Sequence, residues 1–185
     1  MAEQQPDVFR VRPAASADLA RIIEIQREAF RREAVRYGDY RMPAMTETLA
    51  ELAAQAQRNV VLTCCVGDDV VGSVRGHLDG MGIAHLDRLV VLPKWEHHGA
   101  AKRLMDEIEQ RLNACSRYRI LAGEHSERVI RLCGRRGYRP CGYRSAGAYR
   151  WLLMERLNPP SLPGVCSRTG PLRSMGRPGH TTVPK

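Results

Sequence analysis

The spacing of apolar side chains changes several times along the chain, and each change marks a predicted element. Residues 8–12 alternate apolar and polar side chains, as a half-buried strand does. Ser16 then offers a helix N-cap, and the side chains that follow recur at helical spacing. They are Leu19, Ile22, Ile23, Gln26 and Phe30. A polar connection over residues 31–45 leads to a second helix, capped near Thr46, whose apolar face carries Leu49, Leu52, Ala53 and Ala56.

Three β-like segments follow the second helix. Residues 59–66 and 70–78 flank Gly67-Asp68-Asp69, which is a hairpin signal, and residues 83–92 form the longest β-like run. A further helix opens after Gly99. Its apolar face carries Ala101, Leu104, Met105, Ile108 and Leu112.

The last part of the pattern predicts one more strand, one more helix and a hairpin. Residues 119–122 are the strand, and the helix runs from a cap at Ser126 to about Arg136, where Gly137 stops it. Residues 139–144 and 148–155 pair around Ser145-Ala146-Gly147. The order is therefore β-α-α-β-β-β-α-β-α-β-β, which predicts an α/β domain with a mixed sheet and helices on both faces.

Length and composition place this pattern in a single domain over residues 1–157. Residues 158–185 are basic, rich in Pro, Gly, Ser and Thr, and aperiodic, so we expect a disordered tail. No apolar run approaches the ~20 residues of a membrane helix. The first residues lack the basic start and apolar block of a signal peptide, so we expect a cytoplasmic protein with no membrane partner.

Charge and cysteine spacing exclude two further classes of function. The formal net charge is +9, but residues 157–185 contribute four of those charges and no acid, which leaves an ordinary +5 on the domain. We therefore expect no nucleic-acid partner. The six cysteines form no C-x-x-C pair and no metal-ligand spacing with histidine, so we expect reduced thiols and no metal site.

The stretch from Leu89 to Leu104, L-V-V-L-P-K-W-E-H-H-G-A-A-K-R-L, carries the clearest chemical signal. A β-branched apolar run ends at Pro93, and Gly99 and Ala101 open a helix that leaves room at its N-terminus. In such a strand, turn and helix arrangement, free backbone N–H groups and the positive helix end cradle an anion, most often a phosphate.

This stretch resembles the signature of the GNAT superfamily of N-acetyltransferases, V-x-P followed by Q/R-x-x-G-x-G/A and a leucine. Val91-Leu92-Pro93, Gly99, Ala101 and Leu104 match it, whereas Glu96 stands where Gln or Arg is usual. The order of elements is also that of the family, so the resemblance extends over residues 8–156. It implies a single domain whose mostly antiparallel sheet has its fourth and fifth strands splayed apart.

The resemblance also implies the co-substrate, acetyl-CoA, held in the gap between those two strands. Its pantetheine arm would pair with the backbone of Leu89, Val90 and Val91. Its pyrophosphate would meet the N–H groups of the loop and first helical turn, namely His97, His98, Gly99, Ala100, Ala101 and Lys102. Glu96 is unfavourable beside a diphosphate, and protonated His97 and His98 would offset it in part.

A second segment, residues 124–139, resembles the family's pattern L-Y-x-x-x-G-F/Y. Leu132, Gly137 and Tyr138 match. Cys133 stands where many members place the tyrosine that hydrogen-bonds or protonates the departing coenzyme A sulfur, and it is our second catalytic candidate. Val129 stands where an asparagine often contacts the cofactor.

The fourth strand offers His85, Asp87 and Arg88 for general-base catalysis. An amine must be neutral to attack, and a carboxylate acting through water can remove its proton. Asp87 is our catalytic candidate, and His85 on the same strand face would allow a relay. The alternative for Asp87 is a cross-strand salt bridge with an arginine such as Arg75.

The predicted reaction is direct transfer of an acetyl group to an amine within a ternary complex. The acceptor is a small-molecule or protein amine, walled by residues 31–45 with Tyr37 and Tyr40 and by the final hairpin. Glu124 and His125 are reserve base candidates. The alternative is an acyl-CoA-binding or interaction module with weak or no catalysis, and a homodimer is compatible with either.

Overall fold

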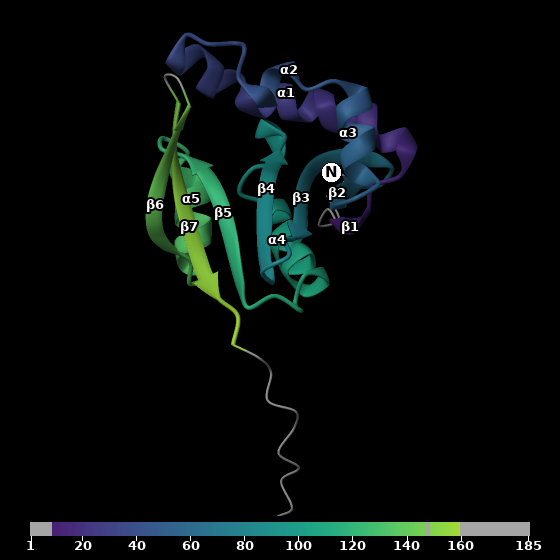
Figure 1. The fold of residues 1–185 in the computed structure, drawn as a ribbon. Helices are drawn as coiled ribbons and strands as arrows, with labels where there is room; N and C mark the ends of the chain where they lie inside the picture. The colour runs from purple at the N-terminus through teal and green to yellow at the C-terminus, as the bar shows by residue number, and fades with distance from the viewer. Residues whose placement is uncertain (1–8, 147–148, 160–185) are drawn as a thin grey trace, which may run out of the picture.

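The sheet has seven strands in the order β1-β2-β3-β4-β5-β7-β6 in the computed structural model, which describes residues 9–146 and 149–159 (Figure 1). Only β4 and β5 are parallel; every other neighbouring pair is antiparallel. The strands are β1 (Arg10–Pro13), β2 (Val60–Val66), β3 (Asp69–Leu78), β4 (Ile83–Val91), β5 (Arg117–Gly123), β6 (Arg139–Ala146) and β7 (Tyr149–Leu157). The predicted mixed, mostly antiparallel sheet is confirmed.

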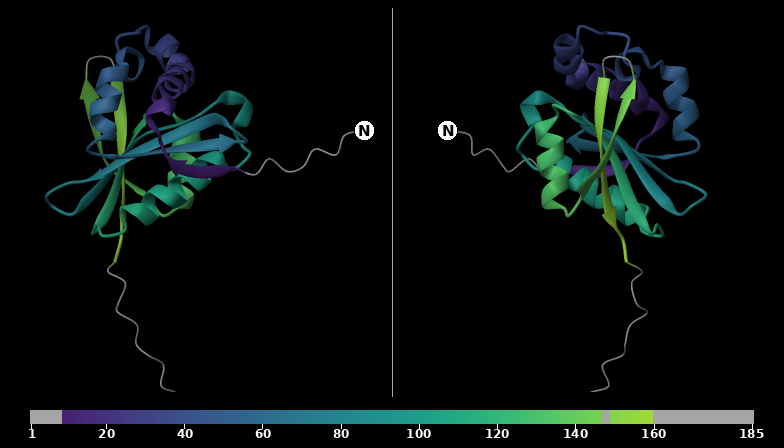
Figure 2. Two further views of the ribbon diagram at one scale, coloured as in Figure 1. Left: turned by 90° about the vertical axis from the view of Figure 1, so that its right-hand side faces the viewer. Right: turned by 60° about the vertical axis from the view of Figure 1, so that its left-hand side comes forward.

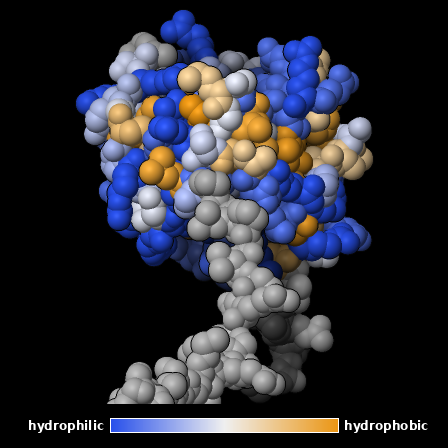
Figure 3. Space-filling model, turned by 60° about the horizontal axis from the view of Figure 1, so that its bottom comes forward, coloured by the Kyte–Doolittle hydropathy of each residue, from blue (hydrophilic) through white to orange (hydrophobic). Residues whose placement is uncertain are grey.

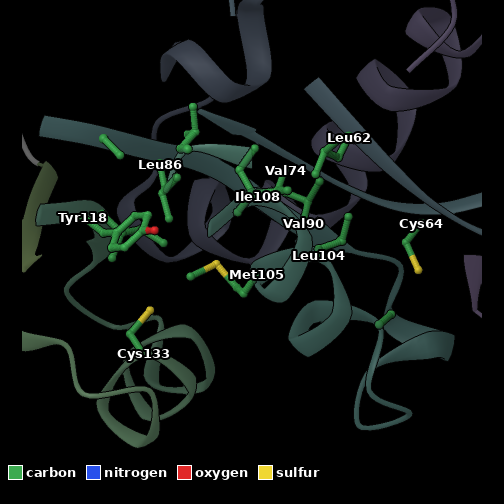
Figure 4. Close-up of a cluster of buried hydrophobic side chains, with 14 of the residues drawn as sticks. Leu62, Cys64, Val74, Leu86, Val90, Leu104, Met105, Ile108, Tyr118 and Cys133 are labelled. Atoms are coloured by element: carbon green, nitrogen blue, oxygen red, sulfur yellow. The ribbon is translucent and has the colours of Figure 1, made fainter. Parts of the chain in front are cut away.

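Helices cover both faces of this sheet (Figure 2). They are α1 (Leu19–Tyr37), α2 (Pro43–Thr46), α3 (Leu49–Ala56), α4 (Ala100–Arg111) and α5 (Glu127–Arg135), with 3₁₀ turns at Ser16–Asp18 and Pro93–Trp95. Side chains alternate along β2, so Val61 faces α1 and α3 while Leu62 faces the core against α4. Figure 4 shows that core, in which Leu104, Met105 and Ile108 of α4 lie among strand side chains.

The fourth and fifth strands separate part-way along their length. Their pairing runs only from Ile83↔Arg117 to Leu86↔Ile120, although β4 continues to Val91 and β5 to Gly123. Beyond Ile120, β5 keeps its pairing with β7 and leaves β4. The predicted splay is confirmed, and it exposes main-chain groups of β4 on that side.

A β-bulge in β4 accompanies the splay. Ser73 pairs with Val90 and Arg75 with Asp87, so Val74 alone lies opposite two residues, Arg88 and Leu89. Arg88 has φ 50°, in the left-handed region that non-glycine residues seldom adopt. Bulges bend a strand and redirect its side chains, and they are frequent beside active sites.

The predicted helix starts and the predicted connection need correction. Ser16 lies inside a 3₁₀ turn, and the Asp18 carboxylate accepts the Ala15 N–H at 2.7 Å. The α3 cap is Thr48, which lies two residues after the predicted position and whose hydroxyl accepts the Glu51 N–H at 3.2 Å.

The first helix continues to Tyr37, well into the predicted connection of residues 31–45, and it ends at Gly38 with φ 62°. This extension is polar, yet it buries Ala34 completely against Met42 and Ala44 of the α2 region. Packing by one small side chain thus stabilises a turn whose composition suggested a loop.

The C-terminal strand ends at Leu157, and the side-chain amide of Asn158 donates to the carbonyls of Asn113 and Cys115, both at 2.9 Å. The predicted tail lies outside the described residues from position 160 onward. Within the described part, no helix combines the length and apolar character of a membrane span. On the face shown in Figure 3, hydrophobic residues lie in small groups between hydrophilic ones.

Candidate functional site

A cleft of about 1710 Å³ opens where β4 and β5 separate. One end, here called the α4 side, is formed by residues 95–102 and by α5. The other end, here called the α1 side, is formed by the C-terminal half of α1, by residues 42–44 and by the β6–β7 hairpin. Residues 87–91 of β4 run between the two sides.

The α4 side presents a helix start with unused donors. Gly99, the N-cap of α4, has φ 94°, and a Cβ there would meet no atom within 4 Å, so the space before the helix is open. The first intrahelical bond runs from the Arg103 N–H to the Gly99 carbonyl at 3.1 Å. The N–H groups of residues 100–102 therefore find no acceptor within the helix.

Most of the residues that the resemblance implied for the cofactor line this cleft. They are Leu89, Val90, Val91, His97, Gly99, Ala101 and Lys102. His98 and Ala100 do not line it: the His98 ring turns back, with Nδ1 2.7 Å from the Glu96 carbonyl, and the Ala100 side chain is buried. Only the main-chain N–H of Ala100 remains available to a ligand.

The unfavourable carboxylate of Glu96 has a partner that sequence reasoning missed. Glu96 forms an ion pair with Arg128 of α5, across the α4 side of the cleft. Arg131 and Arg135 follow Arg128 at helical spacing, and all three line the cleft. Their spacing in the sequence was the signal that would have found them. Arg131 forms an ion pair with Glu127 and Lys102 forms one with Asp106, so of these four cations only Arg135 has no ion pair among the described residues.

Cys133 lies elsewhere than predicted. Its side chain is fully buried in the core and is not among the cleft-lining residues (Figure 4). Burial raises the pKa of its thiol to about 12, so the thiol stays protonated and inert at neutral pH. This placement removes the basis for a contact between Cys133 and a coenzyme sulfur. Val129 and Leu132 line the cleft instead.

Asp87 lies at the junction of the two sides, exposed and lining the cleft. Its carboxylate has no ion-pair partner among the described residues. Arg75 is its register partner, but the predicted salt bridge between them does not form, because Arg75 turns to Glu47. The relay with His85 does not form either. Instead, His85 Nε2 lies 2.7 Å from the Asp79 carboxylate. Hydrogen bonds from the Ile83 N–H and from His85 lower the pKa of Asp79 to about 2.

Beneath the α1 side lies a buried polar cluster. Arg75 donates to both oxygens of Glu47, at 2.7 and 2.9 Å, and to Gln26 at 2.7 Å. Gln26 and Gln55 donate to the same carboxylate at 2.8 and 2.9 Å. Burial would raise the pKa of Glu47, but the hydrogen bonds from Arg75 and Gln26 outweigh it and lower the pKa.

The other residues predicted for the α1 side lie partly inside and partly outside the cleft lining. His125 lines the cleft, whereas Glu124 forms an ion pair with Arg150 at 3.1 Å and does not line it. Tyr37 and Tyr40 do not line it either. The apolar wall is made by Phe30, Met42, Pro43, Ala44 and Trp151.

The fold has clear counterparts among known proteins. The chain matches the Acetyltransferase (GNAT) family over residues 19–138, and it belongs to this family. No curated relative matches the chain by sequence.

Among solved structures, PaiA N-acetyltransferase from Thermoplasma acidophilum, in complex with coenzyme A, aligns with a TM-score of 0.69 and 17% identity, over 81% of this chain and 99% of that one. Ribosomal-protein-S18-alanine N-acetyltransferase from Escherichia coli aligns with a TM-score of 0.66 and 13% identity, over 86% of this chain and 98% of that one. The yncA protein of Salmonella typhimurium, a putative acetyltransferase solved with its cofactor acetyl-CoA, aligns with a TM-score of 0.66 and 19% identity, over 85% of this chain and 99% of that one.

The residues on the α4 side fit a coenzyme A molecule. A diphosphate needs N–H donors, close approach of the main chain and positive charge, and all three are present at Gly99, at residues 100–102 and along α5. The indole Nε1 of Trp95, a cleft-lining residue, is also buried without a hydrogen-bond acceptor. The donors, the open space at Gly99 and the cationic side chains on the α4 side therefore match what a diphosphate requires.

Proposed function

We propose that this protein is an acetyl-CoA-dependent N-acetyltransferase. The observation that carries the proposal is the open helix start at Gly99, set beside splayed strands in which residues 87–91 of β4 no longer pair with β5. Residues 97–102 would hold the pyrophosphate, Arg128, Arg131 and Arg135 would add positive charge, and residues 89–91 would pair with the pantetheine arm. Bound there, the co-substrate supplies an acetyl thioester.

The acceptor amine enters on the α1 side, beside Asp87. Asp87 takes a proton from the ammonium form, directly or through water, so that the neutral nitrogen can attack. The nitrogen bonds to the carbonyl carbon while the carbon–sulfur bond breaks. The proton that the nitrogen then loses passes to the sulfur, which leaves as coenzyme A thiol. A free N–H on the splayed part of β4 polarises the carbonyl. Positioning of the two substrates supplies much of the rate.

An acyl-CoA-binding module without catalysis is the second candidate, and one observation favours it. Cys133 occupies the position of the family's tyrosine but is buried in the core, so no hydroxyl from that position reaches the cleft. The phenols of Tyr118 and Tyr138 are occupied as well, since both donate to Glu109, at 2.8 and 2.9 Å.

Release of free thiol from acetyl-CoA, measured with a panel of amines, separates the two candidates. An acetyltransferase releases thiol only when a suitable amine is present, and mass spectrometry finds the N-acetylated product. A module binds acetyl-CoA in calorimetry but releases no thiol with any amine. Absence of acetyl-CoA binding would refute both.

A further inference from the structure

The bulge in β4 gives the α1 side a second charged residue next to Asp87. In a regular strand two consecutive side chains point to opposite faces. Here the bulge and the left-handed φ of Arg88 bring both Asp87 and Arg88 into the wall of the cleft. The Arg88 guanidinium lies toward α1, 6.0 Å from the centre of the Phe30 ring. A strained non-glycine conformation of this kind is frequent where a side chain must be aimed at a ligand.

Within the part of the chain that the structure describes, Arg88 has no ion-pair partner. The charge of Arg88 helps to lower the pKa of the buried Glu47 carboxylate. Both oxygens of that carboxylate, however, already accept hydrogen bonds from Arg75, Gln26 and Gln55. Among the described residues Arg88 forms no ion pair, with Asp87 or with any other carboxylate, and its Nε is buried without an acceptor. Arg75 and Arg88 together face one carboxylate, so one positive charge remains unbalanced at the cleft floor.

The other charged side chains that line the α1 side are also mostly positive. Arg32 and Arg36 of α1 and Arg144 of β6 line the cleft, and none of the three is ion-paired within the described chain. The carboxylates that line this side are Asp87 and Glu33, and Glu33 accepts a hydrogen bond from Ser126. A polyamine or another polycation would meet repulsion here, whereas an anionic group is attracted.

We propose that Arg88 binds a carboxylate of the acceptor, so that the acceptor is an amine that itself bears a carboxylate, of the amino-acid class. The planar guanidinium matches a carboxylate with two parallel hydrogen bonds. Asp87, one residue away and not paired with Arg88, receives the ammonium end. The two neighbours thus hold a zwitterion by its two charges. This inference rests on the proposed function and names the substrate class of the same site.

The test compares amines that bear a carboxylate with amines that lack one. Thiol release from saturating acetyl-CoA is measured with glycine against glycinamide, with β-alanine and γ-aminobutyrate against their amides, and with spermidine. We expect kcat/KM at least about tenfold higher for the acids, since a hydrogen bond between two charged groups is stronger than one between neutral groups. Arg88→Gln should remove this preference by raising KM for the acids alone, and Arg88→Lys should restore part of it.

Binding experiments keep the inference separate from catalysis. Calorimetry should show that the N-acetyl acids bind the intact protein and not Arg88→Gln, while acetyl-CoA affinity stays unchanged in both. Arg139→Gln, an exposed arginine of β6 outside the cleft, is the matched control and should behave as the unmodified protein. Thermal melting confirms that each variant is folded.

Three results would overturn the inference. They are equal turnover of acids and amides, a preference for spermidine, and an equal effect of Arg88→Gln on acids and amides; each leaves the proposed acetyltransferase standing. If no amine releases thiol, the proposed function fails, and binding of the acids decides the inference alone: binding lost in Arg88→Gln supports it, and no binding to the intact protein refutes it.

Discussion

The two sides of the cleft are built in different ways. The α4 side uses main-chain groups of one short stretch, residues 97–102, and it tolerates a change as adverse as Glu96 because Arg128 of α5 supplies the opposite charge. The α1 side uses side chains from α1, α2, β4 and the β6–β7 hairpin. On the proposed function, the first side binds the coenzyme and the second binds the acceptor amine. Substitutions should therefore affect one side without the other.

The largest effect is expected from Arg75→Met, which leaves Glu47 buried and unpaired beneath the α1 side. Breaking a buried pair in this way costs about 3–5 kcal/mol of unfolding free energy. Denaturant unfolding measures the loss, and the double variant Arg75→Met/Glu47→Met should recover much of it. A loss below about 1 kcal/mol in the single variant would contradict the assigned role of the cluster.

The same cluster predicts the acid sensitivity of the fold. Because the folded-state pKa of Glu47 is lowered, its contribution is fully present above its unfolded pKa of about 4.3, and it is lost as the pH falls below that value. Arg75→Met removes the largest of the interactions that lower this pKa, the hydrogen bonds from Arg75. Between about pH 5 and about pH 3, the range on either side of that unfolded pKa, the variant should therefore lose less unfolding free energy than the intact protein.

Asp87→Asn should lower kcat by about a hundredfold or more at neutral pH, since general-base catalysis contributes roughly 10²–10⁴. Acetyl-CoA affinity, measured by calorimetry, should not change, because Asp87 is outside the residues assigned to the coenzyme, 89–91 and 97–102. Asp68→Asn, an exposed carboxylate at the β2–β3 turn, is the matched control. An unchanged kcat would move the base elsewhere on the α1 side, with His125 next in line.

Gly99→Val should weaken acetyl-CoA binding about tenfold or more, because a branched side chain fills the open space where the phosphates approach the main chain. The φ of 94° also makes this substitution strained, at about 1–2 kcal/mol of stability. Gly67→Val, at φ 58° and likewise in open space, carries comparable strain away from the cleft. It should lose stability and keep its affinity. Equal affinity in both variants would refute the pyrophosphate assignment.

The smallest effect is expected from Glu96→Gln. Removing this carboxylate frees Arg128 for the diphosphate, and the acetyl-CoA affinity should rise by about two- to fivefold, as is typical of a partly exposed ion pair. The gain should shrink in high salt. Glu107→Gln, which removes the same charge from an ion pair of α4 outside the cleft, is the control. A weaker affinity at low salt would mean that the ion pair orders the binding loop.

Local pattern in the sequence determined the order of strands and helices except for the short α2, together with the helix start at Gly99 and the position of Asp87 on β4. These features depend on neighbours within a few residues, where spacing of apolar side chains, glycine and proline acts directly on the backbone. The resemblance to the family added the splay of the fourth and fifth strands, which the pairing of β4 and β5 confirms.

Only the tertiary structure decided how the charged and reactive side chains are used. One extra residue in β4 turned Arg88 into the cleft, and the approach of Glu47 drew Arg75 away from Asp87. The rotation of α5 about its axis placed Arg128 toward Glu96 and Cys133 in the core. Each outcome depends on contacts between residues far apart in the chain, where a shift of one position reverses the face that a side chain presents.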